Sequence, residues 1–344
     1  MVKKIGSPKI STLLDSKKEK TWIARIEEKR GLINWFVVTL FVIGLVVVLF
    51  ISLDPFFSVK HKLAASSFDK ELEKKIIEDY YKLPNAGELP FADLDQERIN
   101  ENIREIVDRE LTFLSGDYGV YVKNLNTGES FGTKENTIFT AASLIKLFVA
   151  GSYYKELDKN PNLFAEKLIL REEDRVGGAG SLVNDPSGSS YELSFLVEKM
   201  LNQSDNTAFA MVTRFLGFSK VKKFIKSNGF SETNFEKNDT TPNDIGVFFE
   251  KLYKNELFDK NYTGEMIGSM TNTAFEDRLP FYLPTSTKIS HKVGTWDGAY
   301  SDAGIIFAPK GDYIIVIMTD GADYNEAINT IRKLSEIIYN YFNK

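Results

Sequence analysis

The sequence contains no cysteine and only two histidines, His61 and His291, among its 344 residues. The absence of cysteine excludes disulfide bonds, cysteine-ligated metals and a cysteine nucleophile. Two histidines supply poorly both a Ser-His-Asp triad and a histidine-based metal site. If a serine of this chain is a nucleophile, another kind of group must accept its proton. Lysine can do so when burial or neighbouring cations lower its pKa.

The chain also lacks an excess of basic charge. Its formal net charge is −5 at pH 7, so we expect no nucleic acid partner. Hydrophobic residues make up 43% of the sequence and charged residues 26%, and these are ordinary values for a globular protein. The length allows one large domain, or two smaller ones, with additional segments.

One long apolar segment occupies residues 33–53. Its 21 residues carry no charge, and a helix of about 20 apolar residues spans a bilayer. A cleavable signal has a shorter apolar core of roughly 7–15 residues. Residues 1–32 hold nine Lys and Arg against four acidic residues, and basic flanks stay in the cytoplasm. We therefore predict a cytoplasmic tail over 1–32, a transmembrane helix over 33–53, and a cell-membrane protein whose remaining residues lie outside the cytoplasm.

The segment after the apolar run reads as a stalk. Residues 54–110 combine helical patterns with a turn-rich break, LPNAGELP, at 83–90. A helix pattern over 95–114 has apolar residues at helical spacing and leads into the globular part. We place an extracytoplasmic helical stalk or linker at 54–110 and a catalytic domain at 111–344.

Strand patterns occur at both ends of this domain, and helical patterns lie between them. DYGVYVKNL (117–125) alternates as a half-buried strand does. Later strand patterns lie at 289–295, 301–309 and 312–320, followed by an amphipathic helix over 324–342. Helical patterns dominate residues 143–255. This order predicts an α+β fold, in which both ends of the domain form an antiparallel sheet around an inserted helical subdomain.

The pattern Ser-x-x-Lys occurs four times, as Ser67/Lys70, Ser143/Lys146, Ser152/Lys155 and Ser219/Lys222. In TAASLIKLFVA (140–150), small residues precede Ser143 and a helical pattern follows. Lys146 then lies on the same helix face, one turn on. A serine at a helix N-terminus also lies near free backbone N–H groups, which can stabilise an oxyanion. The alternative is a capping serine beside a solvated lysine, and the motif alone does not decide.

Two later stretches add chemistry to the Ser143 segment. QSDNTA holds Ser204, Asp205 and Asn206, and HKVGT holds Lys292, Val293, Gly294 and Thr295. Singly, the first reads as a capped helix start and the second as a strand with a glycine. In order, the three stretches match the set Ser-x-x-Lys, Ser-Asp-Asn and Lys-Thr-Gly of class A β-lactamases and penicillin-binding proteins. Three loose motifs in the right order are far more specific than one.

From about residue 116 to 342 the chain resembles the catalytic domain of class A β-lactamases. The stretches GAGSL (178–182), NDTTPNDI (238–245) and SDAGIIFAPKGDYIIVIMTDG (301–321) are similar to that family too. The resemblance implies that Ser143 is the acylated nucleophile and that Lys146 helps to deprotonate it. It also implies that Ser204 relays the proton to the leaving nitrogen. No metal or organic cofactor is implied.

The same resemblance implies the residues that bind substrate. Asn206 hydrogen-bonds the substrate amide, and Lys292 supplies positive charge near Ser204 and the substrate carboxylate. Gly294 and Thr295 belong to the substrate-binding strand. The backbone N–H groups of Ser143 and Thr295 then form the oxyanion hole.

The sequence departs from the family at two places. Val293 stands where the family usually has a threonine or serine that helps to bind the substrate carboxylate, and Thr295 is a possible substitute. The family's Glu-x-x-x-Asn loop, whose glutamate activates the deacylating water, is shortened here to 231–237. Glu236 is the candidate base and Glu232 the second choice. Neither has the asparagine partner, so solvated surface acids are favoured over a base.

Three functions remain. The leading interpretation is a serine β-lactamase-like hydrolase that opens β-lactam rings through an acyl-enzyme on Ser143. The shortened loop and the anchor favour instead a penicillin-binding protein or D,D-carboxypeptidase acting on acyl-D-Ala-D-Ala bonds of peptidoglycan. A non-catalytic, membrane-anchored wall-binding protein is the third, disfavoured because the motif residues are all present.

Overall fold

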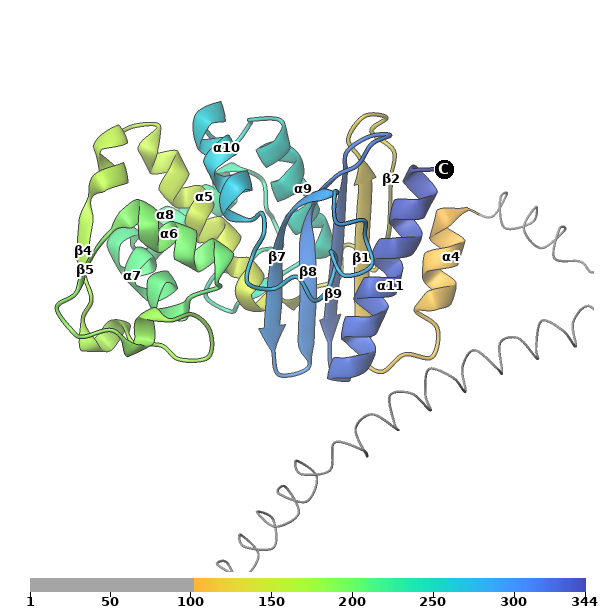
Figure 1. Cartoon of the computed structure of the whole chain (residues 1–344), viewed down its shortest axis with the longest axis horizontal. Helices are drawn as coiled ribbons and strands as arrows, with labels where there is room; N and C mark the ends of the chain where they lie inside the picture. Colours follow the sequence, from red (N-terminus) through yellow and green to blue (C-terminus); the bar gives the residue numbers. More distant parts are fainter. Residues whose placement is uncertain (1–101) are drawn as a thin grey trace, which may run out of the picture. The chain divides into compact units, whose positions relative to one another are not determined.

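The computed structural model describes residues 102–344 (Figure 1). The predicted tail and transmembrane helix, together with residues 54–101 of the predicted stalk, lie outside the described residues. Within 102–344, none of the helices combines the length and the apolar character that a bilayer span requires. The anchor and the membrane location therefore stay predictions.

The main sheet has five strands in the order β2-β1-β9-β8-β7, each antiparallel to its neighbour. The strands are β1 (Asp117–Asn124), β2 (Ser130–Thr133), β7 (Lys288–Trp296), β8 (Ala299–Phe307) and β9 (Tyr313–Asp320). The early strand β1 pairs with the late strand β9 along its whole length. The prediction of an α+β fold, with an antiparallel sheet built from both ends of the domain, is confirmed.

The burial of β9 agrees with its place inside the sheet. Tyr313 to Thr319 of β9 are all buried, as expected of a central strand covered on both faces. β8 and β7 form a hairpin whose turn contains Asp297 and Gly298, and Gly298 has a φ of +73°. Asp-Gly is a preferred pair for two-residue hairpin turns because glycine adopts positive φ freely. β7 is the last strand in the order and is therefore an edge strand. The backbone groups on its outer side are not paired within the sheet.

Two terminal helices, α4 (Ile103–Glu110) and α11 (Tyr324–Phe342), lie side by side next to the sheet (Figure 1). One buried apolar cluster joins them to the strands, and its members include Ile103, Val107, Ile331, Leu334 and Ile338. α4 falls within the range 54–110 that we assigned to the stalk. Since its apolar side chains are buried in this core, α4 belongs to the globular domain, which starts before residue 111.

The inserted helices lie on the other side of the sheet (Figure 1). They are α5 (Lys146–Leu157), α6 (Leu193–Asn202), α7 (Asn206–Leu216), α8 (Phe218–Ser227), α9 (Pro242–Tyr253) and α10 (Lys260–Ser269). Their shared core contains Phe148, whose ring lies 5.2 Å from that of Phe230 and 5.4 Å from that of Phe248, both edge to face. Such aromatic pairs stabilise a core beyond the area they bury.

Two short strands tie the start of the inserted region to its middle. β3 (Phe139–Thr140) pairs with β6 (Asp239–Thr240). Directly after β3, the N–H of Ala141 donates to the carbonyl of Asn238 at 2.7 Å. The segment that leads into Ser143 is therefore held against the end of the short 231–238 loop. A second pair, β4 (Lys167–Ile169) with β5 (Ser190–Glu192), lies at the end of the inserted region that is remote from the main sheet (Figure 1).

Candidate active site

Ser143 lies in a single 3₁₀ turn, η1 (Ala142–Ile145), which continues directly into α5. The preceding residue, Ala142, has a φ of +46°, in the left-handed region that non-glycine residues rarely occupy. Backbone strain of this kind costs free energy and concentrates at functional sites. Ser143 is partly exposed and lines a pocket of about 350 Å³, which we call the Ser143 pocket.

Lys146 is 2% exposed, and its amine is surrounded by acceptors. Nζ donates to the Ser204 carbonyl at 2.5 Å, to Ser204 Oγ at 3.1 Å and to Asn206 Oδ1 at 2.6 Å. Sequence reasoning expected the amine to approach the Ser143 hydroxyl. In the described part of the chain, no hydrogen bond joins the Lys146 amine to the Ser143 hydroxyl. The amine contacts Ser204 and Asn206 of the Ser-Asp-Asn stretch instead.

Burial lowers the pKa of Lys146 from 10.5 to about 7, and the nearby Asp205 carboxylate only partly opposes this effect. A low-dielectric site disfavours the charged ammonium form. Near neutral pH a large share of Lys146 is therefore the neutral amine, which can accept a proton. Because the chain has few histidines, a serine nucleophile needs another proton acceptor, and Lys146 has the lowered pKa that this role requires.

Asp205 explains the middle residue of the Ser-Asp-Asn stretch. It is fully buried and caps α7, where its Oδ1 accepts the N–H of Ala208 at 2.8 Å. Its Oδ2 accepts the N–H groups of Ser181 and Leu182 at 2.7 and 3.0 Å. A side chain at Gly180 would place Cβ only 2.1 Å from that oxygen. The stretch GAGSL is thus folded around Asp205.

Ser204 and Asn206 are held on either side of this carboxylate. Ser204 adopts a φ of +54°, a second left-handed residue at the site. Asn206 donates from Nδ2 to the carbonyl of Gly177 at 2.7 Å while its Oδ1 accepts from Lys146. The predicted residues Lys146, Ser204 and Asn206 are therefore brought together in one hydrogen-bonded group beside Ser143.

Lys292, on β7, is 1% exposed, and its Nζ donates to the Val293 carbonyl at 3.2 Å. Burial lowers its pKa well below 10.5, and the charge of Lys146 lowers it further. A carboxylate placed beside Lys292 would favour its charged form again.

Gly294 lets β7 approach the nucleophile turn. A Cβ at this position would lie 3.1 Å from the Ala141 carbonyl and 3.4 Å from Ala142 Cβ. The N–H of His291 points away from β8, because it donates to the Met270 carbonyl at 2.9 Å. Backbone direction alternates along a strand, so the N–H of Thr295, four residues on, leaves the same edge. This orientation suits the predicted oxyanion role of Thr295, which lines the Ser143 pocket.

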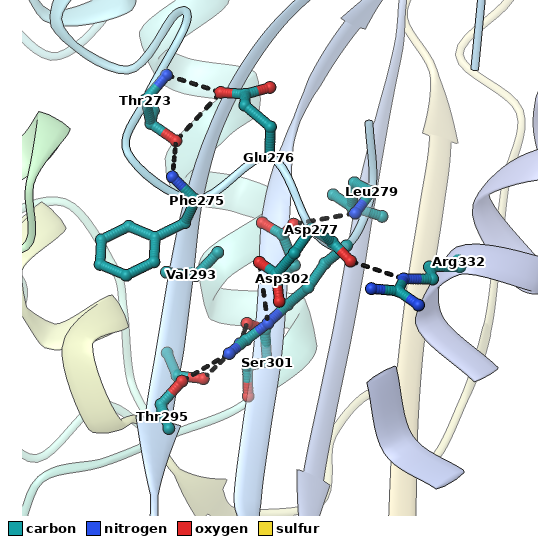
Figure 2. Close-up of polar contacts among 12 residues, drawn as sticks. Thr273, Phe275, Glu276, Asp277, Leu279, Val293, Thr295, Ser301, Asp302 and Arg332 are labelled. Carbon is teal, nitrogen blue, oxygen red and sulfur yellow. Dashed lines mark hydrogen bonds and ion pairs between the residues drawn. The ribbon is translucent and has the colours of Figure 1, made fainter. Parts of the chain in front are cut away.

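Arg278 is a residue that sequence reasoning missed. It lies in the segment between α10 and β7, is 3% exposed, and its Nη1 donates to the carbonyls of Gly294 and Ser301, both at 2.7 Å. Its Nη2 donates to Thr295 Oγ1 at 2.6 Å. Figure 2 shows Thr295 at this contact and Val293, which has no hydroxyl, on the same strand. An isolated arginine in a loop belongs to no motif, so no sequence signal could have found it.

The segment that carries Arg278 is held by two carboxylates, of which Asp302 is buried and Glu276 is exposed (Figure 2). Asp302 on β8 accepts the N–H of Leu279 at 3.0 Å and contacts His291 Nδ1 at 2.9 Å. Glu276 accepts the N–H of Thr273 at 2.6 Å and lies 3.4 Å from His291 Nε2. Each carboxylate thus contacts both the imidazole and a backbone N–H of the segment.

The imidazole of His291 is held as a cation. Burial alone lowers the pKa of His291, but the carboxylates of Asp302 and Glu276 outweigh it and raise the pKa from 6.5 to about 9. The resulting contribution to stability is complete below pH 6.5 and is lost as the pH rises through about 9. His291 thus stabilises the loop beside the site and is not part of a catalytic triad.

The remaining lining of the Ser143 pocket is largely apolar. Four aromatic side chains, which we call the aromatic wall, belong to it: Phe209, Phe218, Phe235 and Trp296. The ring of Phe235 lies 5.3 Å from Phe218 and 6.4 Å from Phe209. Lys146 Nζ lies 5.7 Å from the ring centroid of Phe209. These residues come from α7, α8, the 231–238 loop and β7, and their convergence carries no sequence signal.

Glu236 is the one carboxylate among the described residues that line this pocket. Its Oε1 pairs with Lys222 Nζ at 3.0 Å, and the side chain is 57% exposed. Glu232 is exposed and absent from the lining, and its N–H donates to Asp244 at 3.0 Å. In residues 102–344, no three His, Asp or Glu side chains gather as a metal-binding group.

The comparisons with known proteins agree with one another. Residues 98–342 match the family described as "Beta-lactamase enzyme family". A β-lactamase of Streptomyces lavendulae is 23% identical over 236 residues, which cover 62% of this chain and 77% of that protein. A β-lactamase of Streptomyces fradiae is 22% identical over 211 residues, covering 56% of this chain and 69% of that protein.

Solved structures share the fold. The structure of PBP-A is similar with a TM-score of 0.67 and 24% identity, covering 70% of this chain and 96% of that chain. A β-lactamase of Sphaerobacter thermophilus has a TM-score of 0.66 and 21% identity, covering 70% of this chain and 97% of that chain. Because the family match spans more than half of the sequence, the resemblance inferred from the motifs is confirmed, and the chain belongs to the β-lactamase enzyme family.

Proposed function

We propose that this protein is a serine hydrolase that reacts with β-lactams through an acyl-enzyme on Ser143. The observation that carries the proposal is the group around the Lys146 amine, which contacts Ser204 and Asn206 in the pocket that Ser143 lines. An acyl transfer needs a nucleophile, a base, an acid for the leaving group and an oxyanion site. All four have a candidate within this pocket or at its edge.

The acylation step uses these groups in turn. Ser143 Oγ attacks the lactam carbonyl carbon while neutral Lys146 accepts the hydroxyl proton. Ser204, hydrogen-bonded to Lys146, passes its hydroxyl proton to the lactam nitrogen as the carbon–nitrogen bond breaks, and Lys146 transfers the proton it took from Ser143 to Ser204. The N–H groups of Ser143 and Thr295 stabilise the oxyanion. Both lysines are buried, so their protonation states respond strongly to the substrate.

The substrate carboxylate of a β-lactam has a cationic site on β7. Thr295 Oγ1 accepts from Arg278 Nη2, which leaves the threonine hydroxyl proton free to bond a carboxylate. The pKa of Lys292 is lowered by burial, whereas a guanidinium group is a permanent cation in proteins. We assign the carboxylate to Thr295, Arg278 and Lys292, with Thr295 replacing the hydroxyl that Val293 lacks.

Deacylation is the weak step of the proposed cycle. The ester on Ser143 needs a water and a group that takes its proton. Glu236 is the one described carboxylate in the pocket lining, and it pairs with Lys222 at the surface. This arrangement favours slow turnover and therefore gives weight to the penicillin-binding alternative. A mutant of PBP-A, 25% identical to this chain with a TM-score of 0.64 and covering 74% of this chain and 97% of that chain, is known as an acyl-enzyme complex with penicillin G.

We also propose that the reaction takes place outside the cytoplasm. The uncharged run at 33–53 and its basic flank support a single anchor with the domain on the outer side. A reporter enzyme fused after Lys344 tests this placement. A reporter that folds only outside the cytoplasm is expected to be active, and activity confined to a cytoplasmic reporter contradicts the anchor.

The function is tested by covalent labelling of the chain with a fluorescent penicillin. Ser143→Ala is expected to abolish labelling, because Ser143 is the one serine among the described residues that lines the pocket. Ser219→Ala is the matched control, since Ser219 also belongs to a Ser-x-x-Lys pattern and is exposed on α8. Normal labelling of the Ser143→Ala protein would refute the assignment. No labelling of the unchanged protein would favour the wall-binding alternative.

A further inference from the structure

Residues 273–279, which we call the Arg278 segment, connect the proposed carboxylate site to a buried histidine. Side chains at every second position of a strand share one face, so those of His291 and Thr295 lie on the same face of β7. Glu276 of the segment lies 3.4 Å from His291 Nε2. Arg278 Nη2 donates to Thr295 Oγ1 at 2.6 Å. In the proposed function, on which this inference rests, these last two residues bind the substrate carboxylate.

His291 is fully buried and lies between two carboxylates. Its Nδ1 lies 2.9 and 3.0 Å from the two carboxylate oxygens of Asp302 on β8. Its Nε2 lies 3.4 Å from Glu276 Oε1 and 3.4 Å from Thr273 Oγ1. A neutral imidazole donates from one nitrogen, whereas the cation donates from both. The cation can therefore serve both carboxylates at once, and the neutral ring cannot.

The same two carboxylates hold the backbone on either side of Arg278 (Figure 2). Asp302 Oδ2 accepts the N–H of Leu279 at 3.0 Å, and Glu276 Oε1 accepts the N–H of Thr273 at 2.6 Å. A buried carboxylate that loses its cationic partner carries an uncompensated charge, which is costly unless the group moves or takes up water. Loss of the imidazole charge should therefore disturb the segment on both sides of the arginine.

We propose that His291 is a positioning residue for the substrate carboxylate. As a cation shared by two carboxylates, it holds the Arg278 segment in the position from which the guanidinium reaches Thr295. His291 itself is buried and absent from the lining of the Ser143 pocket. Loss of its charge should weaken the binding of substrates that carry a carboxylate and leave the acylation step unchanged.

The proposal predicts a loss of affinity in alkaline solution. Burial disfavours the charged form of His291, but Asp302 and Glu276 outweigh burial and raise the pKa of His291 to about 9. The cation is present at neutral pH and is lost as the pH rises through about 9. Lys146, whose pKa is lowered to about 7, is already neutral in that range. The acylation rate constant should therefore stay level while the affinity falls.

The other charged side chains near the segment have different partners. Asp277 Oδ1 lies 3.9 Å from Arg278 Nε, and the Asp277 carbonyl accepts from Arg332 Nε of α11 at 2.6 Å. Lys292 follows His291 in β7, so its side chain points to the opposite face of the strand. The pKa of Lys292 is itself lowered by burial, so the test has to separate the titrations of the lysine and the histidine.

Glu276→Gln separates the two titrations. Glutamine keeps an oxygen that can accept the N–H of Thr273, but it removes one of the charges that raise the pKa of His291. The pKa of Lys292 responds to other groups. Because the Glu276 side chain is 46% exposed, we expect the variant to fold.

The measurement is stopped-flow acylation at a series of benzylpenicillin concentrations, from neutral pH to about pH 10. The concentration dependence gives the apparent dissociation constant and the limiting acylation rate constant separately. The methyl ester of benzylpenicillin, which has no carboxylate, is measured in parallel. Any change in Lys146 affects acid and ester alike.

With the unchanged protein, the apparent dissociation constant of benzylpenicillin should rise roughly tenfold over this range, the loss expected for a charged hydrogen bond. The constant for the ester should not change. In the Glu276→Gln protein the rise should occur at lower pH. Glu265→Gln is the matched control, because Glu265 is an exposed acid of α10 and is not among the groups that act on His291. It should keep the midpoint of the unchanged protein.

His291→Gln removes the titrating group itself. This variant should bind benzylpenicillin weakly at neutral pH and lose no further affinity as the pH rises, with an unchanged limiting acylation rate constant. If it does not fold, the comparison of Glu276→Gln with Glu265→Gln still decides.

Three results would overturn the inference. An affinity that is constant across the range, or equal losses for acid and ester, would show that His291 serves the fold alone. A midpoint that does not move in the Glu276→Gln protein would assign the titration to Lys292. In each case the proposed function stands. If neither compound acylates Ser143 of the unchanged protein, the proposed function fails and the inference fails with it.

Discussion

The two sides of the Ser143 pocket differ in chemistry. On one side Lys146, Ser204 and Asn206 form a buried polar group in which the amine has three acceptors. On the other side lie the rings of the aromatic wall and the carboxylate of Glu236, which is paired with Lys222. The first side supplies what acylation needs. Among the described residues, the second offers only Glu236 as a base, and Glu236 is paired with Lys222. This contrast supports the proposal that the protein forms an acyl-enzyme faster than it releases the acyl group.

The expected loss in deacylation rate can be estimated. A positioned general base contributes about 10²–10⁴-fold to a reaction, or about 3–5 kcal/mol of activation free energy. A site that lacks the base for one half-reaction keeps the rate of the other half. Acylation should therefore proceed normally, while release of the acyl group is slower than in class A β-lactamases by roughly that factor.

The largest expected effect is the pH dependence of acylation, which tests the polar side. Lys146 accepts a proton only as the neutral amine, and its pKa is lowered to about 7. Its neutral fraction, and with it the acylation rate, should rise roughly tenfold per pH unit below that value and level off above it. Stopped-flow acylation by benzylpenicillin from pH 5 to 8 measures this. A rate that is flat across the range would exclude Lys146 as the base.

A smaller effect is expected from Arg278→Lys. Lysine keeps the charge, but its single nitrogen cannot occupy the two positions from which Nη1 and Nη2 donate to the carbonyls and to Thr295. The apparent affinity for benzylpenicillin should fall by roughly tenfold, as expected when a charged hydrogen bond is lost. The methyl ester of benzylpenicillin, which has no carboxylate, serves as the control. Equal losses for acid and ester would show that Arg278 only maintains the fold.

The sequence was most informative where the functional residues lie close together in short motifs. Ser143, Lys146 and the Ser204–Asn206 stretch are local patterns. The structure brings Ser143, Lys146 and Asn206 to one pocket, and Lys146 hydrogen-bonds Ser204. The strands were predictable for the same reason, since alternation and apolar runs are local. The predicted helix at 324–342 coincides with α11.

Features made by distant segments could not be predicted in this way. Arg278 reaches Thr295 only because Asp302 and Glu276 fix its loop. The aromatic wall combines four elements that no motif connects. The stalk boundary was misplaced because burial of Ile103 and Val107 depends on α11, which lies more than two hundred residues further on.

The smallest expected effect belongs to Glu236→Gln, which tests the aromatic side. Glu236 is exposed and ion-paired, and surface pairs of this kind contribute little. The substitution should leave both the deacylation rate and the acylation rate unchanged. Recovery of free enzyme after pulse labelling measures the first. A large drop in deacylation would show that the short loop still delivers a base, and the protein would then be a full β-lactamase.

The central claim, fast acylation with slow release, is tested most directly by the intact mass of the protein over time. The protein is mixed with an excess of benzylpenicillin, and its mass is followed until the antibiotic is removed and beyond. The account predicts an adduct of one penicillin per chain that forms promptly, maps to Ser143 and persists after removal. An adduct that disappears quickly while the penicillin is hydrolysed would contradict the account and establish an efficient β-lactamase.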